Sequence, residues 1–386
     1  MRLYWLELKK LLSSAAVWGF IAACLLFNAY LVISGSGDVY ADFVGAAAYD
    51  TGYVLNQSFY EKLSRLTAAD GQAEYLEQLQ YETDGAADVF EGYDTKYIGE
   101  GYIGIWQATG PLAQAMRDKY SALQKAVNEK AARDESLTLY FAGATYNRHQ
   151  QLFNDIMGWL LVEGALLAVL LVFLLVGYES IHKTGDVVYA AKKGRRILRI
   201  KMAVSLPAGL GAYVLMALFT LLAYFTLHDY GGTWGSSVSS LFNYRYDIIG
   251  GYRPFVTWHS FSVLTYLAAT LGMSAGLIVC FSLMAFGLAV LIRNHYIGFF
   301  VFLAANAAVI VLPMQMPKTL TISLYSGYYA MLTPVWLWLK HSLWFTDGDV
   351  DILWPHFETL GFCVSLLALA AFCLLAGMYF RKRDLT

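Results

Sequence analysis

Six long apolar stretches divide this chain of 386 residues. About 20 consecutive apolar residues cross the hydrocarbon core of a membrane as one α-helix. The pattern therefore predicts an all-α integral membrane protein with six transmembrane helices. The stretches run over 15–33, 156–177, 202–227, 261–292, 296–312 and 357–380.

A basic connector, residues 178–201, separates the second apolar stretch from the third. It carries seven Lys or Arg residues against two acidic ones, Glu179 and Asp186. Short loops rich in Lys and Arg stay cytoplasmic. Counting the six spans outward from the connector predicts that both termini are cytoplasmic.

The same count places residues 34–150 outside, and this long polar segment is acidic on balance. Leu112, Met116, Tyr120 and Leu123 recur at spacings of three and four, which predicts a helix up to about Ala131. Apolar residues over 59–79 predict a second helix, broken near Gly71. The stretch 84–104 is rich in Gly, Asp and Tyr and predicts a loop. We expect a mostly helical extracellular domain.

Two further segments complete the expected architecture. Residues 1–14 mix Trp and Leu with Lys and Arg, which predicts an amphipathic helix along the inner membrane surface. Residues 151–386 hold the other five spans, the connector and an apolar outside hairpin over 313–356. This hairpin is interrupted by Gly327 and Pro334 and is crowded with Tyr and Trp, so we expect it not to cross the membrane.

The composition excludes an ordinary soluble globular protein. Hydrophobic residues make up 58% of the chain and charged residues only 15%, with a mean hydropathy of +0.47. The four cysteines all lie in apolar stretches and are expected to be buried hydrophobic side chains. They give no evidence of the redox compartment.

The short motifs predict no catalytic, cofactor-binding or metal-binding residue in this chain. It has no phosphate-binding loop of the GxxxxGK[ST] type, no HExxH and no CxxC. Gly99, Gly101 and Gly104 match GxGxxG, but no predicted strand precedes them. Residues 272–276 match GxSxG, yet they lie inside a predicted span, where glycines at this spacing favour close helix packing.

Three polar residues inside the predicted spans are candidates for a translocation path: Glu163, Asn28 and Asn306. Ionisable side chains within a membrane usually face a bundle interior or a cavity. Glu163 lies about two turns from the outer end of its span, so an interfacial or hydrogen-bonded structural role stays open. For the two asparagines, hydrogen bonding between helices is the alternative.

The connector resembles the cytoplasmic loop of ABC-2 type ABC transporter permeases. The resemblance lies in Glu179 after the second span, Gly185-Asp186, Val188-Tyr189, Lys192 to Arg195 and Lys201 at the third span. In that family the loop forms a short coupling helix. The order of surface helix, six spans and apolar hairpin before the last span is also similar.

The resemblance implies a dimeric exporter permease in a bacterial plasma membrane, formed with an identical or related chain. Two cytoplasmic ATPase subunits would bind ATP and Mg and push on the connector, so this chain would not itself be an enzyme. Membrane lipid is an expected partner and nucleic acid is not. The residues expected to contact the ATPase are Glu179, Thr184, Gly185, Asp186, Tyr189, Lys192, Lys193 and Arg195.

Three other functions remain open from the sequence. A mechanotransmission permease acts on extracytoplasmic partners and usually has four spans. A membrane-embedded enzyme would use Glu163 with a histidine at the membrane boundary. A receptor would bind its ligand with the outside domain. The sequence does not name the cargo.

Overall fold

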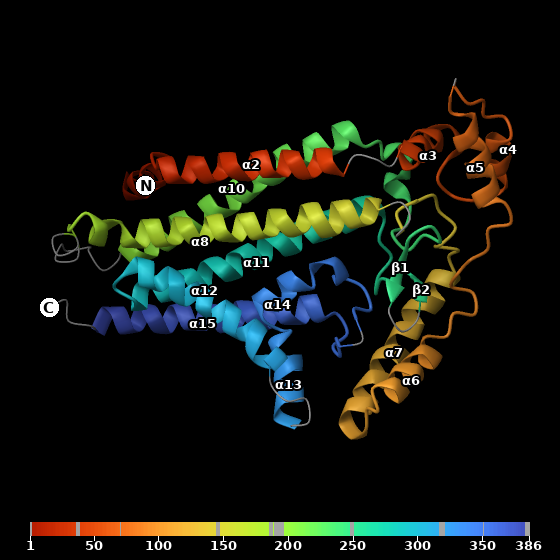
Figure 1. Ribbon diagram of the computed structural model, residues 1–386. Helices are drawn as coiled ribbons and strands as arrows, with labels where there is room; N and C mark the ends of the chain where they lie inside the picture. Colours follow the sequence, from red (N-terminus) through yellow and green to blue (C-terminus); the bar gives the residue numbers. More distant parts are fainter. Residues whose placement is uncertain are drawn as a thin grey trace.

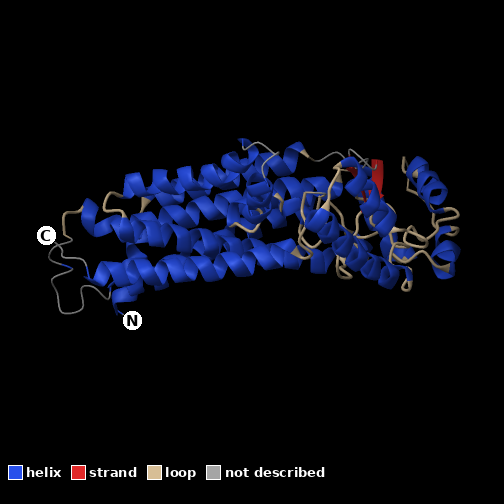
Figure 2. Ribbon diagram, turned by 90° about the horizontal axis from the view of Figure 1, so that it is seen from below, coloured by secondary structure: helices blue, strands red, loops and turns tan. Residues whose placement is uncertain are grey.

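The computed structural model describes residues 2–35, 39–69, 71–143, 147–184, 188, 197–247, 251–315, 321–349 and 351–382. It is predominantly helical, and six of its helices are long and apolar enough to cross a membrane. They lie side by side in one elongated bundle (Figures 1 and 2). The predicted six-helix membrane protein is confirmed. These helices are α2 (Ala15–Ser34), η1 with α8 (Gln150–Ile156 and Met157–Ile181), α10 (Ile197–Leu227), α11 (Val263–Leu291), α12 (His295–Gln315) and α15 (Phe357–Lys382).

The centre of the bundle is formed by α8 and α11. In their most apolar windows, 78% and 67% of the residues are buried, against 28% or less in the other four spans. A helix that is apolar on all sides is stable only where other helices or lipid surround it. The sequence of α8 meets this condition except at Glu163 and, in its last turn, at Glu179 and Ser180, so α8 takes the central position.

Close packing of α11 against α15 depends on Gly276. A Cβ atom at this position would lie 2.7 Å from the Phe362 ring of α15, whereas a Cβ atom at Gly272 would meet nothing within 4 Å. One glycine of the GxxxG pair therefore permits the contact, and the other faces away from it. The predicted packing role is confirmed at Gly276.

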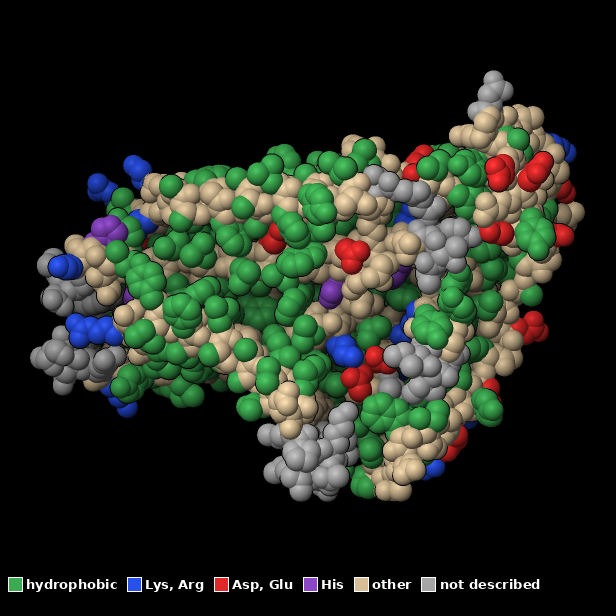
Figure 3. Space-filling view, in the orientation of Figure 1, with side chains coloured by type: hydrophobic (Ala, Val, Ile, Leu, Met, Phe, Trp, Pro, Cys, Tyr) green, Lys and Arg blue, Asp and Glu red, His purple; other side chains and the backbone are tan. Residues whose placement is uncertain are grey.

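The two ends of the bundle differ in charge. Helix α1 (Arg2–Leu12) packs across the end where α8 finishes and α10 begins. Lys and Arg side chains gather at this end, which we call the basic end, whereas most Asp and Glu side chains lie beyond the opposite, distal end (Figure 3). This separation follows the charge pattern of the sequence.

Five helices form two small lobes beyond the distal end: α3 (Val39–Thr51), α4 (Gln57–Leu63), α5 (Ala73–Thr83), α6 (Thr95–Ile105) and α7 (Gly110–Ala131). One apolar core joins α3, α4 and α5 and includes Phe242, which stacks on Phe141. Another joins α6 and α7 and includes Trp258 and Leu353. Residues 34–150 therefore do not fold around one core of their own, because later segments complete both lobes.

The predicted loop over 84–104 is wrong from residue 95 onward, where α6 begins. Asp94 caps this helix by accepting hydrogen bonds from the backbone nitrogens of Lys96 and Tyr97. Gly99 lets α6 approach α7 closely, because a Cβ atom at this position would lie 2.7 Å from the Tyr120 ring. The cap and this tertiary contact outweigh the poor helix propensity of the glycines.

The connection between α10 and α11, at the distal end, contains a β-hairpin that the all-α prediction omits. Strands β1 (Tyr244–Asp247) and β2 (Gly251–Pro254) pair antiparallel, with Tyr246 opposite Tyr252. The short helix η3 (Gly231–Gly235) precedes the hairpin and packs against α3. Four-residue strands carry too little periodicity to be distinguished from an aromatic loop.

Short helices form the segment before the last span: α13 (Thr321–Ala330), α14 (Pro334–Leu339) and η4 (His341–Leu343). The indole of Trp336 donates to the Val309 carbonyl of α12 at 3.1 Å. The Ser365 hydroxyl of α15 donates to the Leu332 carbonyl at 2.8 Å. This segment is therefore packed against two spans, and none of its described helices exceeds 10 residues.

Gly276→Val should destabilise the bundle by about 1–3 kcal/mol, because the new side chain overlaps Phe362. Gly272→Val is the matched control, since it makes the same change on the open side of the same helix. The measurement is thermal unfolding in detergent micelles. Equal losses for the two variants would contradict a specific contact at Gly276.

Candidate functional site

A buried ion pair closes the two ends of the basic connector. Glu179 lies in the last turns of α8 and Lys201 in the first turns of α10, and their side chains are 3% and 0% exposed. The Lys201 ammonium donates to Glu179 Oε2 and to the Leu175 carbonyl oxygen. Because both charges have left water, they stabilise the structure only while they remain paired.

Helix α1 extends this ion pair. Lys10 donates to Glu179 Oε1 at 3.0 Å and to Glu7 Oε1 at 2.6 Å. Its ammonium also lies 4.4 Å from the centre of the Tyr178 ring. Partial burial opposes the charge on Lys10, but the two carboxylates outweigh it and raise its pKa. Lys10, Glu179 and Lys201 therefore bind α1, α8 and α10 to one another; we call these three residues and Glu7 the basic-end network.

The structure places two of the residues expected to contact an ATPase. Glu179 is buried in the basic-end network. Thr184 is exposed just beyond α8, and its backbone nitrogen donates to the Glu179 carbonyl at 2.9 Å. The other six lie outside the described residues: Gly185, Asp186, Tyr189, Lys192, Lys193 and Arg195. ATPase contact by these residues stays a prediction.

Two of the three translocation-path candidates meet inside the bundle. Asn28 Nδ2 of α2 donates to Glu163 Oε2 of α8 at 2.7 Å. The two residues are only 1% and 6% exposed. Asn306 lies elsewhere, on α12, where its Nδ2 donates to the Phe302 carbonyl at 2.8 Å and approaches the Met284 sulfur. Of the three, only Asn28 and Glu163 form one polar site.

At the distal end, the second span begins as a π-helical turn, η1. His341 Nε2 lies 2.8 Å from the Asn154 carbonyl oxygen of this turn. π-Helical turns are rare and frequently occur at functional sites. A cavity of about 360 Å³ lies between η1, β1 and η4. Its volume is that of a small-molecule pocket.

His149 lines this cavity at the start of η1. Its ring packs against Phe153 and Phe255, with ring centres 4.6 and 4.5 Å away. Burial lowers the pKa of His149 to about 3, so the ring is neutral at physiological pH. Nδ1 contacts the Tyr140 hydroxyl at 3.2 Å, whereas Nε2 is enclosed without a hydrogen-bond partner among the described residues.

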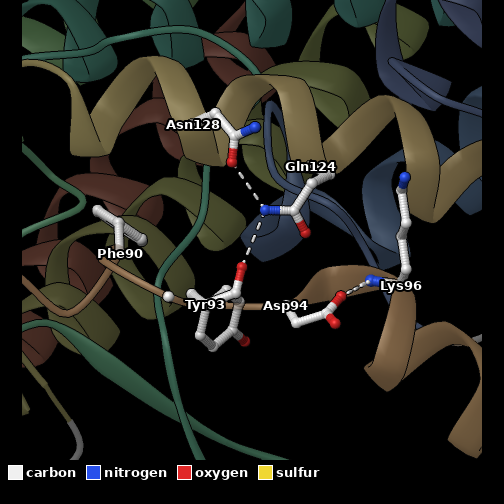
Figure 4. A pocket seen from close by; sticks show the side chains of 7 residues that line it. Phe90, Tyr93, Asp94, Lys96, Gln124 and Asn128 are labelled. Atoms are coloured by element: carbon white, nitrogen blue, oxygen red, sulfur yellow. Dashed lines mark hydrogen bonds between the residues drawn. The ribbon is translucent and has the colours of Figure 1, made fainter.

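A second pocket lies where α6 meets α7 (Figure 4). There Gln124 Nε2 donates to the Tyr93 carbonyl at 3.0 Å and to Asn128 Oδ1 at 2.9 Å. Gln124 Oε1 accepts from the Thr95 backbone nitrogen at 2.7 Å. Since these polar atoms hold α6 on α7, we assign them a structural role.

The two glycine motifs have helical surroundings. Ser274, the central residue of GxSxG, is buried within α11, and its hydroxyl donates to the Thr270 carbonyl at 2.9 Å. It does not lie on the strand-to-helix turn that a nucleophile elbow requires. Gly99, Gly101 and Gly104 all lie within α6 rather than after a strand. Among the described residues, no three His, Cys, Asp or Glu side chains gather as metal ligands.

No family model, curated protein or solved structure matches this chain. The function of this chain is therefore inferred from the resemblance of the connector and from the geometry of the bundle.

Sequence reasoning missed the residues that complete these sites, although weak signals were present. Glu7 and Lys10 are spaced three apart on the amphipathic helix, which is the spacing of neighbouring side chains on one face. Cys24 lies one turn before Asn28, and its thiol faces the Glu163 carboxyl. His149 precedes an apolar stretch and showed no distinguishing pattern.

Lys201→Met should destabilise the protein by about 3–5 kcal/mol, because it leaves Glu179 buried with only its Lys10 partner. Glu179→Gln combined with Lys201→Met should cost less than the sum of the single changes, in a double-mutant cycle of thermal unfolding. The exposed Glu100–Arg117 pair of α6 and α7 is the control, and its cycle should show little coupling. Additive losses at Glu179 and Lys201 would show that the two do not act as a pair.

His149→Gln should make the protein less sensitive to acid. The pKa of His149 is about 3 in the folded state and the ordinary 6.5 in the unfolded state. At pH values between these two, the unfolded chain therefore binds more protons than the folded chain. Stability should therefore fall as pH drops below about 6.5, and the variant should lose this part of the fall. The measurement compares melting temperatures from about pH 7 to about pH 4, with exposed His182→Gln as control. A variant that matches the wild type throughout would refute a buried neutral His149.

Proposed function

We propose that this chain is the transmembrane permease subunit of an ATP-driven ABC exporter. It acts as a dimer, and cytoplasmic ATPase subunits drive it through the 178–201 connector. The proposal starts from the resemblance of the connector to ABC-2 permeases. It assigns the basic end to the cytoplasm, in agreement with the positive charge there.

The basic-end network is the observation that carries this proposal. A subunit that receives force through a loop must pass the displacement on to its spans. Glu179 and Lys201 close the loop at both ends, and Lys10 adds α1, which leads directly into α2. A push on the connector would therefore move α8, α10 and α1 together. An isolated basic loop that only attracts anionic lipid would not need buried partners at both ends.

The number of spans favours this function over a mechanotransmission permease. Six described helices are long and apolar enough to cross a membrane, whereas that class usually has four. The enzyme alternative gains no support, because no histidine is among the described hydrogen-bond partners of Glu163.

Affinity purification of the full chain from its native membrane, followed by mass spectrometry, tests the proposal. We expect an ATPase subunit to copurify in stoichiometric amount. Lys192→Glu combined with Arg195→Glu should remove it, because both reverse positive charge at the expected docking surface. Lys62→Glu combined with Lys125→Glu, an equal charge change on exposed distal positions, should retain it.

Absence of any ATPase from the wild-type preparation would refute the permease proposal. Loss of the ATPase from both double variants would refute docking at the connector, since net charge alone would then explain the result.

A further inference from the structure

The Asn28–Glu163 pair is a polar contact between two spans at membrane depth. Asn28 lies six residues before the end of α2, roughly 9 Å along the helix axis. Helices α2 and α8 run side by side in Figure 1, and this hydrogen bond joins them within the apolar region. The Asn28 amide donates this 2.7 Å bond, and the Cys24 thiol of α2 also contacts the Glu163 carboxyl, so both α2 groups that face the carboxyl are neutral.

The surroundings of Glu163 do not compensate a negative charge. The groups that face the carboxyl from α2 are the Asn28 amide and the Cys24 thiol. The neighbouring Gly164 packs against Tyr213 of α10 and Ile278 of α11. No Lys, Arg or His belongs to this set of described residues. An ionised carboxylate without a counter-ion is costly to bury, so the neutral acid is the form that fits the site.

The hydrogen-bonding capacity of the Asn28 carboxamide also favours the protonated form of Glu163. Its Oδ1 is buried and has no hydrogen-bond donor among the described residues. A carboxylate can only accept hydrogen bonds, whereas a carboxylic acid also carries one O–H donor. A protonated Glu163 can therefore accept from Asn28 Nδ2 and offer the donor that Oδ1 lacks. An amide and a carboxylic acid are complementary in this way.

Of the two helices that carry this pair, α2 is the one that can move. Only 28% of its apolar window is buried, against 78% for α8. It follows α1 after two residues, and α1 is bound to the connector ends through Lys10. A displacement at the basic end therefore reaches Asn28 along one continuous segment, while Glu163 stays on the central helix.

We propose that Glu163 and Asn28 form a proton-binding site whose occupancy is coupled to the separation of α2 from α8. While the helices are together, Glu163 is a carboxylic acid paired with the Asn28 amide. When α2 moves away and water enters, the carboxyl O–H bond breaks, a water molecule accepts the proton, and a hydrated carboxylate remains. The reverse motion takes up one proton. This inference goes beyond the permease proposal and does not require it.

Infrared spectroscopy of the full chain in lipid nanodiscs tests the site without any ATPase. The C=O stretch of a protonated carboxylic acid is separate from the carboxylate bands. We expect such a band at neutral pH in the wild type and its loss in Glu163→Gln. Subtracting the two spectra removes the contribution of Glu358, which is also buried. The proposal would be overturned if no carboxylic-acid band of the wild-type spectrum disappeared in Glu163→Gln.

Exchange in deuterated buffer tests the role of Asn28. Asn28→Leu keeps the branching and the number of side-chain heavy atoms but removes the pairing, so the carboxyl should exchange about tenfold faster, the factor expected for one lost hydrogen bond. Asn306→Leu is the matched control, because Asn306 is also an asparagine within a span but does not contact Glu163. It should exchange as the wild type does.

Wild-type exchange in Asn28→Leu would overturn the coupling between the two residues. If Asn28→Leu does not fold, Asn28→Ser replaces it. Serine has a shorter side chain without a carboxamide, so it also removes the pairing, and it is tolerated within membrane helices. Equal acceleration by Asn28→Leu and Asn306→Leu would also overturn the proposal, because a general loosening of the bundle would then explain it.

Discussion

The ion pair between Glu179 and Lys201 is the constraint on which the basic end depends. Two charges that are nearly inaccessible to water must remain together, so the end of α8 and the start of α10 stay together too. Lys10 adds α1 to this arrangement. The attachment points of the connector cannot separate without exposing a charge or leaving it unpaired. The basic-end network therefore holds the adjoining ends of α1, α8 and α10 together.

Most of the bundle is held by dispersion and shape rather than by polar groups. Within a membrane, apolar surface gains nothing by leaving lipid for another helix, so close packing decides which helices associate. Gly276 provides such packing for α15. Against this background the Asn28–Glu163 pair differs, because it joins a lightly buried span to the central one through hydrogen bonding.

In the distal region, sequence patterns predict some elements and miss others. The stripe through Met116 and Tyr120 identified α7, because one helix face is buried regularly. Helix α6 was not predicted, since its stability comes from the Asp94 cap and from contact with Tyr120 rather than from propensity. The cavity beside His149 was equally invisible. It is assembled from three segments that lie far apart in the chain.

The sequence alone determined the membrane class, the number of spans and the separation of charge between the two ends. Each is a property of local composition, because hydropathy and charge act residue by residue on partition into lipid. It also singled out Asn28 and Glu163 as polar residues at membrane depth. Only the tertiary structure decided that they touch, that Lys201 and Lys10 neutralise Glu179, and that Asn306 stays apart. Such contacts depend on which helices become neighbours, and packing in three dimensions makes that choice.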